Sequence, residues 1–154
     1  MNAITGTIIP ALSLDDIHLR RSKLIEKCAE AERHVLKLLA CASSACQPKA
    51  PFSQKIEALK KALKNQKTPP PAALLKLLED LGPISDLRSN LAHATISIAE
   101  IEGQRVAVFR SADEQIDGSG ERRIMTLACL DAAHQAASDV ANRLKQAASR
   151  PRAV

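Results

Sequence analysis

One short stretch of the chain, residues 86–93 (DLRSNLAH), places a permanent cation, two small polar groups and an imidazole within eight positions. Arg88 carries a planar guanidinium whose fork of N–H donors fits a phosphate or a carboxylate. His93 carries the one type of side chain whose ordinary pKa lies near neutrality, so it can act as a general acid or base. Ser89 and Asn90 add a hydroxyl and an amide. These residue types are the ones that an oxyanion site with proton transfer would need.

The spacing of Arg88 and His93 leaves two interpretations open. Positions five apart on an α-helix are separated by about 140° around the axis and about 7.5 Å along it, so they do not share a face. Ser89 and Asn90 are the nearer helical neighbours of His93. In the first interpretation, Arg88 reaches a phosphate that His93 also contacts. In the second, which the R-x4-H spacing alone favours, Arg88 pairs with a surface carboxylate and His93 is packed or solvated.

Helices are expected to position this stretch. A long first helix is predicted from about Leu14 to Cys41, because apolar residues recur there at helical spacing. Ser13 is its expected N-cap, with Asp16 three residues later in a capping-box arrangement. Leu12 and Ile17 occupy the two positions of a hydrophobic staple.

Two more helical segments are predicted before residue 94. Ser53 can cap a second helix, whose apolar face carries Ile56, Leu59 and Leu63. A third helix is predicted over residues 72–81 after a Pro-rich break. Gly82 and Pro83 are expected to end or kink it before the chain resumes helically through residues 86–93.

The pattern changes after Thr95. Alternating apolar residues on either side of residues 102–104 predict a short β-hairpin. Residues 111–122 read as a polar surface loop, which lacks the Gly-Lys-Ser/Thr ending of a phosphate loop. A last helix is predicted from about Thr126 to Ala148. The expected fold is all-α, an up-down bundle of four to five helices with a small β-hairpin before the last helix.

Length and composition predict one globular domain. The chain has 154 residues, of which 45% are hydrophobic and 25% charged, which excludes a disordered protein. Aromatic residues make up only 1%, so the core must consist of aliphatic side chains. We expect an N-terminal extension over 1–12, a helical domain over 13–148 and a flexible tail over 149–154. Neither an apolar run of 18 residues nor a secretory signal is present, so no membrane partner and a cytoplasmic location are expected.

Positive charge is concentrated in the first part of the chain. The net charge is +5, and residues 1–68 hold 12 Lys and Arg against 6 Asp and Glu. The second helical segment carries most of this excess against a single Glu57, which is compatible with a surface that faces a polyanion. A solvated helix face is the alternative. The candidate RNA-binding residues are Lys55, Lys60, Lys61, Lys64 and Lys67.

No metal site or cofactor site is predicted. Four cysteines occur without the paired spacing of a zinc site, and they are expected to be reduced thiols packed as small hydrophobes. They are Cys28, Cys41, Cys46 and Cys129. Three further histidines are expected to be solvated or packed, namely His18, His34 and His134. Glu30 and Glu32 are candidate carboxylate partners for the helix that carries Arg88.

Residues 87–94 (LRSNLAHA) resemble the signature of the HEPN superfamily, the higher eukaryotes and prokaryotes nucleotide-binding domains. The wider layout is also similar: a long first helix, a basic second helix, a Leu-rich helix leading into the Arg…His stretch, and a final helix. The segment Phe52–Ile56 with its Leu-rich continuation is similar to the mannitol operon repressor group. The resemblance covers roughly residues 13–148, with motif identity over about eight residues. The family usually places Asn or another strongly polar residue directly after the Arg, whereas this chain has Ser89 there and Asn at position 90.

The resemblance implies a metal-independent endoribonuclease that acts as a homodimer, in the manner of a toxin from a toxin–antitoxin pair. Arg88 would bind the scissile phosphate, and His93 would act as general base on the ribose 2′-OH or as acid on the leaving oxygen. Asn90 or Ser89 would orient the phosphate or the imidazole. The products would be a 2′,3′-cyclic phosphate and a 5′-OH end, with no cofactor. The implied partners are RNA, a second copy of the chain, and a cognate antitoxin or regulatory protein.

Two other function classes stay open beside the nuclease. HEPN-like proteins also include interaction modules without demonstrated cleavage, in which Arg88 and His93 would stabilise a dimer interface or the helix end. A DNA-binding regulator ranks last, because no helix-turn-helix recognition segment is evident. With two Phe and no Trp or Tyr, base stacking is scarce, so RNA affinity would depend on Lys and Arg and on salt.

Overall fold

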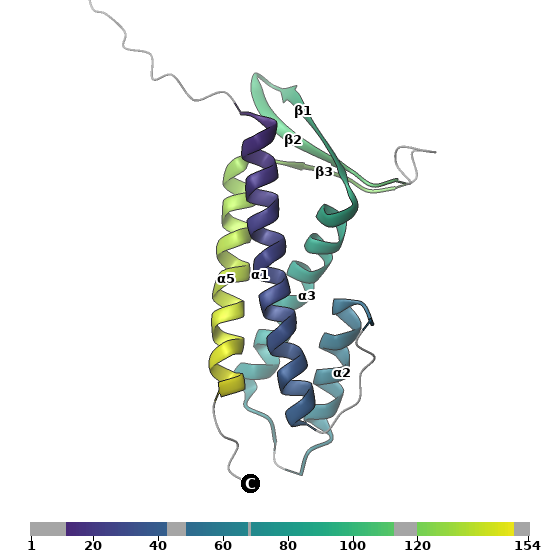
Figure 1. The fold of residues 1–154 in the computed structure, drawn as a ribbon, viewed down its shortest axis with the longest axis vertical. Coiled ribbons are helices and arrows are strands. Elements are labelled where there is room, and N and C mark those ends of the chain that lie inside the picture. The colour runs from purple at the N-terminus through teal and green to yellow at the C-terminus, as the bar shows by residue number, and fades with distance from the viewer. Residues whose placement is uncertain (1–11, 43–48, 68, 113–119, 150–154) are drawn as a thin grey trace, which may run out of the picture.

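The computed structural model describes residues 12–42, 49–67, 69–112 and 120–149, and 70% of these are helical. Helices α1 and α5 lie side by side, and a sheet lies at the end of the molecule where α1 begins and α3 ends (Figure 1). Helix α2 packs between α1 and α3 towards the opposite end. The elements are α1 (Leu14–Cys41), α2 (Phe52–Lys64), α3 (Ala72–His93), β1 (Thr95–Ile101), β2 (Gln104–Arg110), β3 (Arg122–Met125) and α5 (Leu127–Ser149).

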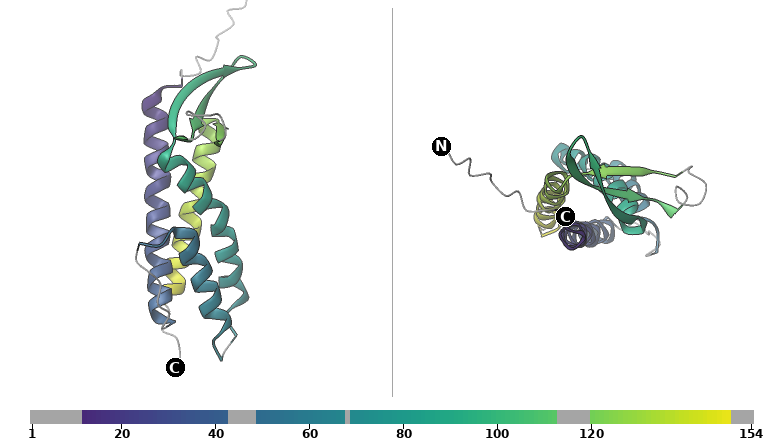
Figure 2. Two further views of the ribbon diagram at one scale, coloured as in Figure 1. Left: turned by 90° about the vertical axis from the view of Figure 1, so that its right-hand side faces the viewer. Right: turned by 90° about the horizontal axis from the view of Figure 1, so that it is seen from above.

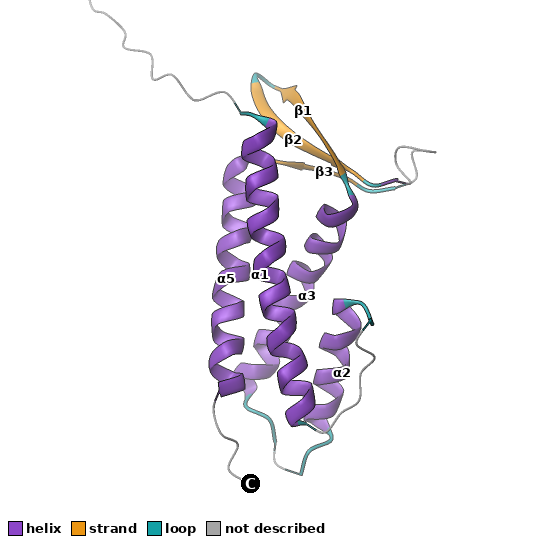
Figure 3. Ribbon diagram, viewed as in Figure 1, coloured by secondary structure: helices purple, strands orange, loops and turns teal. Residues whose placement is uncertain are grey.

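The predicted all-α up-down bundle with a hairpin is wrong. The described residues form four helices and a three-stranded antiparallel sheet in the order β1-β2-β3 (Figure 3). The third strand, Arg122–Met125, overlaps the end of the segment that was expected to be a polar loop. Two arginines in four residues leave no alternating apolar pattern to detect, and the strand exists because it pairs with β2. The rest of that predicted loop falls mostly outside the described residues.

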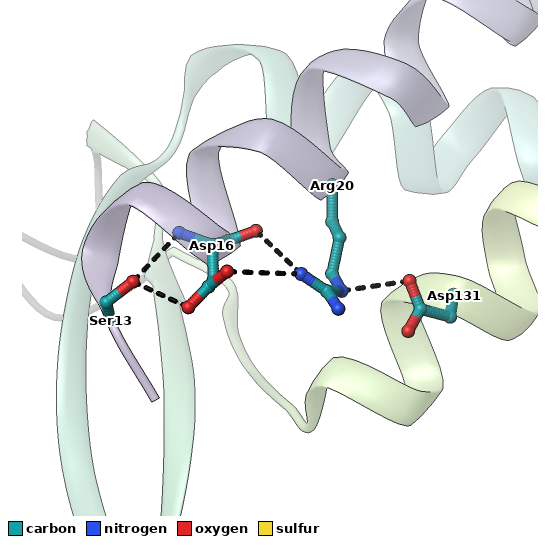
Figure 4. A network of polar contacts seen from close by, with 4 residues as sticks. All are labelled: Ser13, Asp16, Arg20 and Asp131. Carbon is teal, nitrogen blue, oxygen red and sulfur yellow. Dashed lines mark hydrogen bonds and ion pairs between the residues drawn. The ribbon is translucent and has the colours of Figure 1, made fainter. Parts of the chain in front are cut away.

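The start of α1 agrees with the prediction. Ser13 is extended, and its Oγ accepts the backbone N–H of Asp16 at 3.1 Å while donating to Asp16 Oδ2 at 2.7 Å (Figure 4). Leu12 and Ile17 are both buried in one cluster, as a hydrophobic staple requires. Arg20 Nε then donates to Asp131 Oδ1 on α5 at 2.9 Å, so the capped turn is also tied to the neighbouring helix.

The boundaries of α2 and α3 differ from the prediction. Helix α2 begins at Phe52, one residue before the expected cap Ser53, and Pro51 precedes it without a side-chain cap. Helix α3 continues from residue 72 to residue 93 with Pro83 inside it. Proline there removes one hydrogen bond to the carbonyl of Glu79, and both residues are exposed, so water can satisfy that carbonyl. Buried residues on both sides of Pro83, including Leu81 and Leu91, hold the helix to the core.

The predicted β-hairpin is present and its turn is tight. Residues pair in register from Thr95↔Arg110 to Ile101↔Gln104, leaving Glu102 and Gly103 as a two-residue loop. Both loop residues have positive φ, 50° and 76°, which is typical of the type I′ turn that matches strand twist.

The core contains two clusters of mostly aliphatic side chains, and each cluster also holds one Phe. The α2-end cluster joins α1, α2, α3 and α5, and the sheet-end cluster joins the other halves of α1, α3 and α5 to the sheet. Figure 2 shows these three helices running along the molecule towards the sheet. The largest fully buried members of the α2-end cluster are Leu39, Ile56, Leu59, Leu63, Leu78, Leu81 and Leu144. In the sheet-end cluster they are Ile17, Leu24, Leu91, Phe109 and Leu130.

The predicted termini fall almost entirely outside the described residues. Of the extension over 1–12 only Leu12 is described, and it is buried; of the tail over 149–154 only Ser149 is described, as the last residue of α5. Among the described helices, none has both the length and the unbroken apolar character that a membrane span requires.

Candidate functional site

The last turns of α3 divide the Arg…His stretch between two faces. Leu91 is fully buried and Arg88, three residues earlier, is half-buried on the same side of the helix. Ser89 and His93 are four apart and both exposed, so they share the solvent-facing side. No hydrogen bond or ion pair between described residues joins Arg88 to His93. Within one chain, therefore, the cation and the imidazole lie on different faces, as their five-residue spacing requires.

Arg88 extends towards α1. Burial raises the pKa of the Cys28 thiol to about 11, and the nearby positive charge of Arg88 opposes this rise while Glu32 adds to it. The Arg88 Nε is buried and has no hydrogen-bond partner, and the side chain forms no ion pair with any described carboxylate. Arg88 is thus a partly desolvated cation without an ion-pair partner among the described residues, a situation that favours an incoming anion.

His93 is the last residue of α3, and its imidazole is exposed. It makes no hydrogen bond or ion pair within the described ranges, so its ring nitrogens are available to a ligand. The backbone next to it is held from another helix, because a terminal nitrogen of Arg21 on α1 donates to the carbonyl oxygen of Ala92 at 2.8 Å.

Asn90 is already engaged by an acidic residue. Its Nδ2 donates to Glu121 Oε2 at 2.5 Å, and Arg123 contacts the same carboxylate oxygen at 3.3 Å. These contacts tie the end of α3 to the start of β3. The Asn90 side-chain oxygen and the exposed Ser89 hydroxyl make no hydrogen bond to a described residue.

The five candidate RNA-binding lysines have different surroundings. Lys55 is buried, with its side chain 5% exposed, and its Nζ binds Glu32 Oε1 at 2.6 Å. Lys60 binds Glu57 at 2.7 Å. The exposed members, without an ion pair to any described residue, are Lys61, Lys64 and Lys67. Helix α2 lies away from the sheet end, so the structure does not bring these lysines together with His93 in one chain (Figure 1).

Neither predicted carboxylate partner binds Arg88. Glu32 pairs with Lys55, and Glu30 pairs with Lys27 at 2.8 Å. The hydrogen bond from Lys27, together with its positive charge, lowers the pKa of Glu30.

Three basic residues at the sheet end were not predicted as part of the site. One is Arg21, which binds the end of α3. The other two, Arg110 and Arg122, stand opposite each other on β2 and β3, and Arg110 also pairs with Thr95, two residues after His93. Both are exposed, and both make contacts of their own. The predicted hairpin would have been enough to place Arg110 at the sheet end. The position of Arg122 depends on β3, which was not predicted.

The other histidines and the cysteines of the described residues differ in exposure. His18 is exposed, His134 is half-buried, and burial together with nearby Lys37 lowers the pKa of His34. Cys28, Cys41 and Cys129 are free thiols, two of them exposed, and Cys46 lies outside the described residues. No three His, Cys, Asp or Glu residues of the described part gather as metal ligands.

Comparison with known proteins adds no relative. The chain matches no protein-family model, and neither a curated protein nor a solved structure matches it.

Proposed function

We propose that the protein is a metal-independent endoribonuclease of the HEPN type, in which Arg88 and His93 of two copies share one cleft. The observation that carries the proposal is the pairing state of these residues. Arg88 is a partly buried cation with no ion pair to a described residue, and His93 is an exposed imidazole with no hydrogen bond or ion pair to a described residue. If the two residues had only structural roles, we would expect the Arg88 charge to be paired and the His93 ring nitrogens to be hydrogen-bonded.

The chemistry is transesterification within the RNA. His93 removes the proton from a ribose 2′-OH, and the oxygen attacks the adjacent phosphorus. Arg88 stabilises the added negative charge on the phosphoryl oxygens. The bond from phosphorus to the 5′ oxygen breaks, and that oxygen receives a proton from the His93 of the second copy. The products are a 2′,3′-cyclic phosphate and a 5′-OH end.

A dimer is part of the proposal because one chain separates the two groups. The solvent-facing side of α3, with Ser89 and His93, is available to a second copy. Across such an interface, the imidazole of one chain can approach a phosphate that the guanidinium of the other holds. The exposed lysines Lys61, Lys64 and Lys67 are proposed to attract RNA at longer range, and a cognate antitoxin or regulatory protein remains the proposed physiological partner.

The test is cleavage of labelled RNA in EDTA by the full chain. We expect His93→Ala to lower the rate by roughly 10²- to 10⁴-fold and Arg88→Ala by roughly 10²- to 10³-fold. His18→Ala is the matched control, because His18 is also an exposed helical histidine but lies at the start of α1. A substrate with a 2′-deoxy sugar at the cleaved position should remain intact. Cleavage that survives both substitutions, or no cleavage of any RNA, would contradict the proposal.

A non-catalytic interaction module is the second candidate, and one observation favours it. Arg88 lies on the core-facing side of α3 near the buried Cys28 thiol, where a long side chain also packs. In that case Arg88→Ala would weaken folding or dimerisation, and RNA cleavage would be absent from the wild-type protein. Urea unfolding and the sedimentation of both proteins separate this outcome from the nuclease.

A further inference from the structure

We propose that Arg21 is a positioning residue for His93: it holds the last turn of α3 from the neighbouring helix and thereby fixes where the imidazole points. The inference rests on the proposed function for its catalytic consequence, but the contact that carries it is independent of any activity. Arg21 lies 71 positions before Ala92 in the chain, and its terminal nitrogen donates to the Ala92 carbonyl oxygen at 2.8 Å.

The end of α3 needs such a contact. The last four carbonyls of a helix have no partner within the helix. At Ala94 the backbone is already extended, with φ −82° and ψ 144°, so the chain leaves α3 directly for β1. In α1, by contrast, the backbone N–H of Ala42 bonds back to Leu38 and Leu39. Arg21 therefore supplies to the end of α3 a donor that α1 obtains from its own backbone.

The charge of Arg21 suits this place. Carbonyl groups at a helix C-terminus carry partial negative charge, which a cation stabilises. Arg21 is half-buried, its Nε is buried without a partner, and it forms no ion pair with a described carboxylate. Its one hydrogen bond among the described residues is the one to Ala92, so the side chain is committed to the end of α3.

The hydrogen bond from Arg21 is made to the peptide that joins Ala92 to His93. A change in the position of the Ala92 carbonyl oxygen therefore rotates this peptide and moves the His93 Cα. A general base works only within hydrogen-bond reach of its proton, and a displacement of about 1 Å can cost on the order of a hundredfold in rate. Arg21 touches no reacting group and would act through His93 alone.

The test compares Arg21→Ala, Arg21→Lys and the control Arg20→Ala in the full chain. Arg20 is the adjacent residue of α1 and also half-buried, but it binds Asp16 and Asp131 rather than α3. The first readout is the imidazole ring resonances of His93 by NMR, assigned with His93→Gln. We expect Arg21→Ala to shift them, Arg21→Lys to restore most of the shift by keeping a donor, and Arg20→Ala to leave them in place.

The second readout is RNA cleavage. We expect Arg21→Ala to lower kcat on the order of tenfold with a smaller change in KM, and Arg21→Lys to recover most of it. Unchanged His93 resonances in a folded Arg21→Ala protein, or an equal shift in Arg20→Ala, would overturn the inference. If the wild-type protein cleaves no RNA, the proposed function fails, and the ring resonances still decide whether Arg21 positions His93.

Discussion

Individual thiols of the chain lie in opposite environments, and their reactivity should differ accordingly. Burial raises the pKa of Cys28 to about 11 from the ordinary value of 9.0. Because the thiolate is the reactive form, its thiolate fraction at pH 8 is about a hundredfold smaller than that of an ordinary thiol. A hydrogen bond from the Thr126 hydroxyl lowers the pKa of the exposed Cys129, whose Sγ lies 3.2 Å from Thr126 Oγ1. We expect Cys129 to react with iodoacetamide far faster than Cys28, as measured by mass spectrometry.

The cause of the Cys129 reactivity can be checked separately. Thr126→Val removes the hydroxyl and should slow the labelling of Cys129 at pH 8, whereas Thr126→Ser keeps the hydroxyl and should not. Labelling of Cys28 at a rate similar to that of Cys129 would contradict the buried position of the first thiol. The exposed Cys41 provides an internal reference in the same digest.

Residue types in the candidate site were predictable, but their orientation was not. The sequence identifies Arg88 and His93 as groups able to bind an anion and move a proton. The packing of α1 against α3 decides two further features of the site. It brings Arg88 beside Cys28, and it lets Arg21 bind the carbonyl before His93. Such contacts join positions about 60 to 70 residues apart, and no local pattern encodes them.

Helices α1 and α2 are joined by a buried ion pair whose loss should be costly. The Lys55 and Glu32 side chains are 5% and 19% exposed, and their charged atoms are 2.6 Å apart. Glu32→Gln leaves the Lys55 ammonium buried without a counter-charge, so we expect the free energy of unfolding to fall by about 3 kcal/mol. Urea denaturation of the wild type and the variant measures this change.

The matched control for this pair is Glu57→Gln. It breaks the Lys60–Glu57 pair on the same helix, where Glu57 is 70% exposed, and should cost no more than about 0.5 kcal/mol. The double variant Glu32→Gln/Lys55→Met should recover much of the loss, because it removes the unpaired charge as well. A Glu32→Gln protein as stable as Glu57→Gln would show that the buried pair contributes little.

At the scale of elements, structure is predictable from the sequence where several local signals agree. Helix α1 has a cap, a staple and a long apolar period, and its bounds were predicted correctly. Lys55 could also have been recognised as buried, because it lies on the same helical face as Ile56, Leu59 and Leu63. Strand β3 and the continuation of α3 through Pro83 depend on tertiary pairing and packing, which local propensity does not contain.

Across the whole molecule, the site and the lysine-rich helix occupy opposite ends. His93, Arg21 and the paired Arg110 and Arg122 lie at the sheet end, while α2 packs in the α2-end cluster (Figure 1). One chain therefore carries two separate basic regions. Under the proposed function, an RNA that contacts both regions must run along the molecule, or two copies must bring one region of each together.

The two aliphatic clusters should nevertheless unfold as one unit, because α1, α3 and α5 each run through both. We expect Leu59→Ala in the α2-end cluster and Leu130→Ala in the sheet-end cluster each to cost about 3 kcal/mol, since both side chains are fully buried. In native-state hydrogen exchange, either variant should lower the protection of the slowest amides in α2 and in β2 by the same amount. If Leu59→Ala leaves the β2 amides as protected as in the wild type, the sheet end folds independently, and damage at α2 would then spare the site around His93.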